Sequence, residues 1–232
     1  MTKRSATVHV NKLAAAQRQL RAAIRMFFAE EDDLAIHTVA SAAYQLIKDI
    51  KMARGKNEAA DFYLTSIFYA VRDYRRDTLP SHMTSDPELM DWVRKIAREL
   101  PIEATSKLEE VSAYITPDDA KKYWSKRNKA ANFLKHADKD ANAHLALDEI
   151  DNRDLIMQAL SAYSDLLKDG LGAEGRVFWL FSSVSHGESR SLPEKWRKVG
   201  DRLLAIDGNC RREFCAELIE DLNAKGSNAG DA

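Results

Sequence analysis

Apolar side chains recur every three or four positions along almost the whole chain. The clearest example is a stretch with arginines on its other side, where the repeat is carried by Leu13, Ala16, Leu20, Ile24 and Phe27. This is the spacing of one face of an α-helix, whereas a half-buried strand would alternate apolar and polar residues. No segment alternates in that way, so the pattern predicts an all-α protein.

The same periodicity predicts further helices at residues 36–50, 58–76, 89–100 and 147–168, and around Trp196 and Phe214. Capping residues mark several helix ends: Asp86 followed by Pro87 is a typical start, and Gly55 a typical stop. Thr116 and Pro117 are expected to open another helix. Short connections of this kind favour antiparallel neighbours, so we expect a helical bundle.

Glycines at positions 170, 172 and 175 interrupt the helical pattern and divide the chain. We expect residues 10–168 to form the main bundle. Residues 176–225 are expected to form a helical C-terminal extension, which is either a subdomain or a set of helices packed back onto the bundle. The composition of residues 226–232 predicts a disordered tail.

Charge and composition exclude several classes of protein. Lys and Arg total 35 and Asp and Glu 36, a formal net charge of −1, so the chain as a whole has no electrostatic attraction to nucleic acid or membrane. No run approaches the roughly 18 apolar residues of a membrane span. Phosphate-loop, dinucleotide and nucleophile-elbow motifs are absent, so no cofactor is expected. The two cysteines are expected to be reduced thiols, and the protein cytoplasmic.

The densest cluster of side chains that can bind ligands or transfer protons lies in residues 131–140, ANFLKHADKD. Because residues four apart share one face of a helix, Asn132 and His136 are expected to point the same way. Lys135 stands between them, and Asp138 and Asp140 follow. A structural interpretation is that His136 lies near a helix end, where the dipole favours a cation, and that the aspartates turn the chain.

A calcium site is one functional interpretation of this cluster. Asp138, Asp140, Asn142 and Glu149 occupy positions 1, 3, 5 and 12 of an EF-hand loop. Position 6, however, is Ala143, where the loop needs glycine for its sharp turn, and the chain has no partner loop. We therefore expect no metal site.

Ribonuclease chemistry is a second interpretation, since a histidine can transfer a proton beside an amide and a cation that hold a phosphate. The segments AIHTVASAAY, which begins at Ala35, and NFLKHAD resemble those of a group of uncharacterised bacterial and phage proteins. More distantly, the helical layout and the pair Asn132 and His136 resemble HEPN domains. That resemblance implies a helical bundle, often dimeric, in toxin, antiviral or RNA-processing systems. Active HEPN ribonucleases carry an arginine where this chain has Ala131.

A third interpretation is an internal polar network that includes His37, on the helix face of Ser41 and Tyr44. Lys126 and Arg127 belong to a basic run beside Tyr123 and Trp124, which is either a nucleic-acid contact or a solvated face. Three arginines, Arg72, Arg75 and Arg76, also allow two interpretations. They belong either to a solvated helix end or to a phosphate site.

We therefore expect a non-metabolic helical binding protein in a defence, stress or mobile-element system, with an RNA, a nucleotide or a protein as its partner. Its binding residues would be Lys135, Asp138, Asp140, His37, Lys126 and Arg127. The alternative is a metal-free HEPN-type endoribonuclease in which His136 and Asn132 are catalytic. Small-residue helix faces and the HEPN resemblance predict a homodimer.

Overall fold

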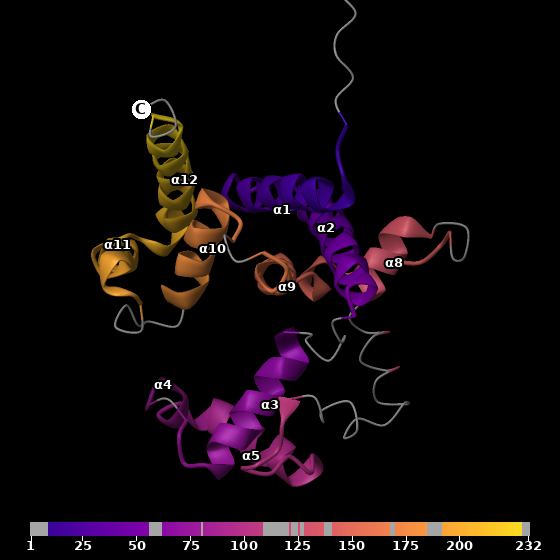
Figure 1. Ribbon diagram of the computed structural model, residues 1–232, viewed down its shortest axis with the longest axis vertical. Helices are drawn as coiled ribbons and strands as arrows, with labels where there is room; N and C mark the ends of the chain where they lie inside the picture. Colours follow the sequence, from indigo (N-terminus) through magenta and orange to yellow (C-terminus); the bar gives the residue numbers. More distant parts are fainter. Residues whose placement is uncertain are drawn as a thin grey trace, which may run out of the picture. The chain divides into compact units, whose positions relative to one another are not determined.

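The computed structural model describes residues 9–55, 62–79, 81–108, 121, 125, 128–136, 141–167, 170–184 and 192–228. Within these ranges every regular element is a helix, which confirms the prediction of an all-α protein (Figure 1). The chain divides into two compact units: Met1–Ile50 with Phe133–Ala232, and Lys51–Asn132. This division differs from the predicted boundary near residue 168.

The helices of the first unit are α1 (Lys12–Phe28), most of α2 (Asp33–Ala53), α9 (Asn152–Ser164), α10 (Ala173–Val184), α11 (Glu194–Ala205) and α12 (Arg211–Asn228). The second unit contains α3 (Phe62–Arg75), α4 (Ser81–Thr84) and α5 (Pro87–Glu99). The boundary between the units falls within α8 (Lys129–Lys135). Helix α12 continues to Asn228, so residues 226–228 are helical where a disordered tail was predicted.

Capping side chains explain where the helices begin. Asp86 accepts a hydrogen bond from the Leu89 amide (3.1 Å), and Pro87 follows it, so α5 starts where the sequence predicts. The predicted helix from Leu147 is wrong at its start, because Leu147–Glu149 is a separate 3₁₀ turn. Asp151 accepts from the Asp154 amide (2.8 Å) and begins α9 at the next residue.

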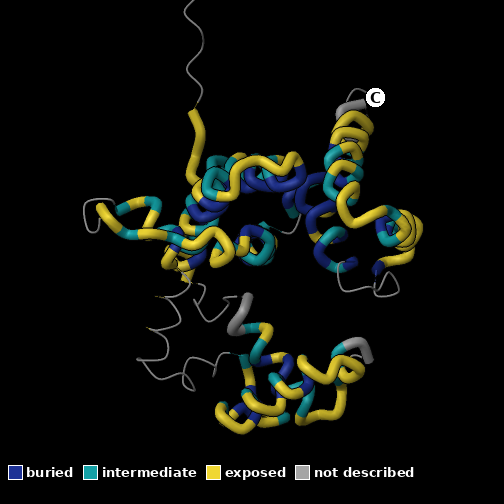
Figure 2. Tube along the Cα trace, turned by 180° about the vertical axis from the view of Figure 1, so that it is seen from behind, coloured by how far each residue is buried: buried dark blue, intermediate teal, exposed yellow. Residues whose placement is uncertain are grey.

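Helix α10 is the centre of the first unit. It packs against α1, α9, α11 and α12 (Figure 1). Its buried residues lie on almost every side of the helix: Ala173, Glu174, Gly175, Val177, Phe178, Leu180, Ser182 and Val184. Figure 2 shows buried residues concentrated where these helices meet. The C-terminal helices are therefore packed back onto the bundle, the second of the two predicted arrangements.

Four phenylalanine rings from α1 and α10 pack edge to face or tilted at the middle of this core. The ring centroids of Phe27, Phe28, Phe178 and Phe181 are 5.3 to 5.8 Å apart across the two helices. These distances are typical of favourable aromatic pairs. The second unit has its own smaller core, formed by Phe68, Val71, Ala97 and Ile102.

A buried carboxylate joins α10 to α1. Glu174 is 2% exposed, and its Oε1 lies 2.7 Å from Nη1 of Arg25 while its Oε2 lies 3.7 Å from Nε of Arg21. Arg21 also donates from Nε to the Leu171 carbonyl (3.1 Å). Gly172 has a φ of 82°, and a Cβ there would lie 2.7 Å from Nη2 of Arg21. Only glycine combines this backbone conformation with so close a guanidinium.

The two cysteines should differ sharply in reactivity. Burial raises the pKa of the Cys215 thiol to about 12, whereas Cys210 is exposed. Only a thiolate attacks a maleimide, and Cys215 stays protonated at pH values well below 12. At neutral pH the native protein should therefore be labelled once, and the denatured protein twice, by mass spectrometry. The variant Cys210→Ser should remove native labelling, and labelling of that folded variant would contradict the structure.

Candidate functional site

Helix α8 carries the polar cluster that the sequence singles out. Ala130 is buried on one side, whereas Asn132, Phe133 and Lys135 are exposed. The helix ends at Lys135, so His136 is the first residue after it and is half-buried. His136 directly follows the last helical residue, and the expectation that it shares a helix face with Asn132 stays a prediction.

The exposed side chains of α8 form a compact chemical set. Asn132 and Lys135 are three residues apart and so lie on neighbouring positions of the helix surface. Phe133 is 37% exposed and follows Asn132 in the chain. An amide that hydrogen-bonds, a ring that stacks and an ammonium group that attracts anions are thus presented to solvent within four residues. This set suits contact with an unpaired nucleotide better than acid–base catalysis.

The position where the HEPN resemblance expects an arginine is the partly buried Ala131. A methyl group supplies neither positive charge nor hydrogen bonds to a phosphate. Helix α8 carries two exposed lysines, Lys129 and Lys135, and Lys135 is the one next to His136 in the chain. This composition weakens the hypothesis of catalysis more than the hypothesis of binding.

Four predicted binding residues lie outside the described residues: Asp138, Asp140, Lys126 and Arg127. Two residues of the EF-hand-like segment, Asn142 and Glu149, are described, and both are exposed. Among the described side chains, no three His, Cys, Asp or Glu residues come together as a metal site would require.

His37 lies on α2, where it is 7% exposed. It is the first of five polar residues that recur alternately four and three positions apart along the helix. The other four are Ser41, Tyr44, Lys48 and Lys51. Sequence reasoning found the first three of these but missed the two lysines, although the regular spacing could have revealed them. His37 and Ser41 are both buried, which favours the internal polar network. A shared site for His37 and His136 stays a prediction.

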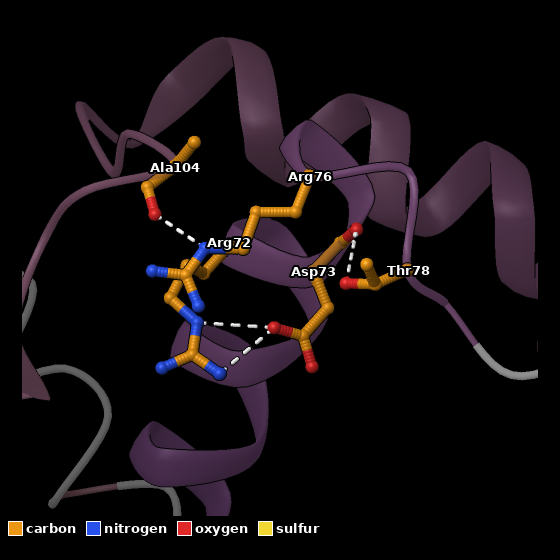
Figure 3. Close-up of polar contacts among 5 residues, drawn as sticks. All are labelled: Arg72, Asp73, Arg76, Thr78 and Ala104. Carbon is orange, nitrogen blue, oxygen red and sulfur yellow. Dashed lines mark hydrogen bonds and ion pairs between the residues drawn. The ribbon is translucent and has the colours of Figure 1, made fainter.

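Two of the three arginines near the end of α3 join this helix to α5 and to the chain after it. Arg75 donates to the carbonyl of Ala97 (2.7 Å), and Arg76 donates to the carbonyl of Ala104 (Figure 3). Arg72 instead pairs with its neighbour Asp73 through Nε and Nη2, at 3.0 and 2.8 Å. The arginines are thus held in place, which the interpretation as a solvated helix end did not anticipate.

Comparison of the chain with protein-family models, with curated proteins and with solved structures gives no match. The HEPN resemblance therefore stays a prediction. None of the described helices is both long enough and apolar enough to cross a membrane.

The two histidines should respond differently to substitution. His37→Ala should lower the free energy of unfolding by about 1–3 kcal/mol, because it removes most of a side chain that is only 7% exposed. His136→Ala should lower it by about 0.5 kcal/mol or less, as is usual for surface positions. Urea unfolding of both variants measures the difference. A loss at His136 as large as the loss at His37 would show that His136 is structural.

Proposed function

We propose that the protein binds single-stranded RNA through the exposed side of α8. The observation that carries the proposal is the exposure of Asn132, Phe133 and Lys135 within one turn of helix. An isolated exposed ring is common on protein surfaces. A ring flanked by an amide and an ammonium group is a more specific combination, because it matches the base, the base edge and the phosphate of a nucleotide.

Single-stranded RNA is the favoured form, since a ring can stack only on a base that is not already paired on both faces. The formal net charge of −1 also favours a local contact over a broad electrostatic surface. Few phosphates would then be neutralised, and the affinity would depend only weakly on salt concentration.

Binding is favoured over cleavage by two features of the same segment. Ala131 stands where the HEPN resemblance expects an arginine, and His136 directly follows the last residue of α8 instead of lying within the helix. The proposal therefore assigns Asn132 and Lys135 to binding. The HEPN relationship and the homodimer remain proposals that accompany it.

Fluorescence anisotropy with a short labelled single-stranded RNA tests the proposal. Phe133→Ala should weaken binding about fivefold or more, because stacking on one base contributes about 1–3 kcal/mol. Lys135→Ala should lower the slope of log K against log salt by about 0.7, the loss of one phosphate contact. Matched controls are Leu147→Ala, which removes an exposed apolar side chain, and Lys195→Ala on α11. Both controls should bind like the parent protein.

Two outcomes would contradict the proposal. Parental affinity in both Phe133→Ala and Lys135→Ala would show that α8 is not the contact. Cleavage of the RNA in the presence of a chelator, lost in His136→Ala, would replace binding with metal-free endoribonuclease activity.

A further inference from the structure

We propose that α3 provides a second contact for single-stranded RNA, in which Tyr69 stacks on a base and Arg76 binds a phosphate. This inference rests on the proposed function and names a further site for the same ligand. Two observations support it. The exposed Tyr69 ring has the Arg72 guanidinium over it, and Arg76 is anchored by one hydrogen bond while its other N–H donors stay free.

Tyr69 is 40% exposed although it lies on a helix that contributes to a core. Its ring is held from two sides. The guanidinium carbon of Arg72 lies 4.6 Å from the ring centroid, and the Phe68 ring meets it edge-on with centroids 5.4 Å apart. A ring that is already ordered loses little conformational entropy when a base stacks on it.

Arg72 is unsuited to be the phosphate ligand itself. Two of its nitrogens donate to Oδ1 of Asp73, so its charge is already paired. Its guanidinium carbon also lies 5.4 Å from the centroid of Phe68. Arg72 therefore supports the Tyr69 ring, and Asp73 holds Arg72 in that position.

Arg76 has the free donors that a phosphate requires. Its Nε donates to the carbonyl of Ala104, which fixes the direction of the side chain (Figure 3). Among the described residues no carboxylate pairs with Arg76, and the residue is exposed. Both Nη groups are thus available in the fork that binds phosphate oxygens.

The geometry of the turn places Arg76 beside Arg72. The Arg76 amide donates to the Arg72 carbonyl (3.0 Å), so the helical turn continues to Arg76. Figure 3 shows the two guanidinium groups on the same side of α3. Because Asp73 already pairs with Arg72, Arg76 is the arginine of the two whose charge an anion can pair. Asp77 is next to Arg76 in the chain, and Glu103 lies 3.9 Å from Arg75.

Variants at Tyr69 and Arg76 test this second contact in the same anisotropy assay. Tyr69→Ala should weaken RNA binding about fivefold or more, whereas Tyr69→Phe keeps the ring and should bind like the parent. Arg76→Ala should lower the salt slope by about 0.7. Arg18→Ala, which removes an exposed arginine from α1, should leave the slope unchanged. Thermal melting confirms that each variant is folded, and Arg76→Gln, which loses the charge but keeps an N–H donor for the Ala104 carbonyl, replaces Arg76→Ala if the loss of that bond unfolds the second unit.

The outcomes separate this inference from the proposed function. Parental binding by Tyr69→Ala and by the Arg76 variant, together with weak binding by Phe133→Ala, would overturn the α3 contact and leave the α8 contact standing. Weak binding by Tyr69→Ala with parental binding by Phe133→Ala would support α3 and overturn α8. No RNA binding by the parent protein would overturn both.

Discussion

The fold of the first unit depends on the pairing of one buried carboxylate. A charged group as deeply buried as Glu174 is costly unless an opposite charge and hydrogen bonds accompany it. Its partners, Arg21 and Arg25, are one turn apart on α1, so α10 can settle only where its first turn meets both of them. We infer that this pairing fixes the position of α10 along α1. Helices α9, α11 and α12 all pack on α10, and α9 and α12 also pack on α1, so these helices meet around the paired elements.

The turn before α10 is adapted to the same pairing. Gly172 leaves room for the Arg21 guanidinium, and Arg21 in turn donates to the Leu171 carbonyl. At the other end of the preceding helix, the Asn152 side-chain amide donates to the backbone and side-chain oxygens of Asp33, both at 3.0 Å. The start of α9 is thereby joined to the start of α2, which anchors the chain that leads from α8 into the core.

The sequence predicts local structure well and long-range contacts poorly. Periodicity placed α1 and α5, and Asp86 with Pro87 placed the start of α5, because the interactions that decide them lie within four residues. The carbonyl partners of Arg75 and Arg76 are 22 and 28 residues away, and Glu174 is 149 residues from Arg25, so spacing alone could not find them.

The candidate site was predicted in part for the same reason. Asn132, Lys135 and His136 were found as a local cluster near a helix end, and α8 does end at Lys135. The exposure of Phe133 was missed, since an aromatic residue in a helix is usually core. Its exposure depends on which side of α8 is buried, and periodicity over seven residues does not decide that.

The central claim is that RNA contacts the exposed side of α8, and crosslinking tests it most directly. The native protein would be irradiated with single-stranded RNA containing 4-thiouridine, and the crosslinked peptides would be identified by mass spectrometry. Stacking on Phe133 predicts a crosslink at or beside that residue, lost in Phe133→Ala and retained in Leu147→Ala. Crosslinks that never fall between Lys129 and His136, in a protein that binds the RNA, would contradict the claim.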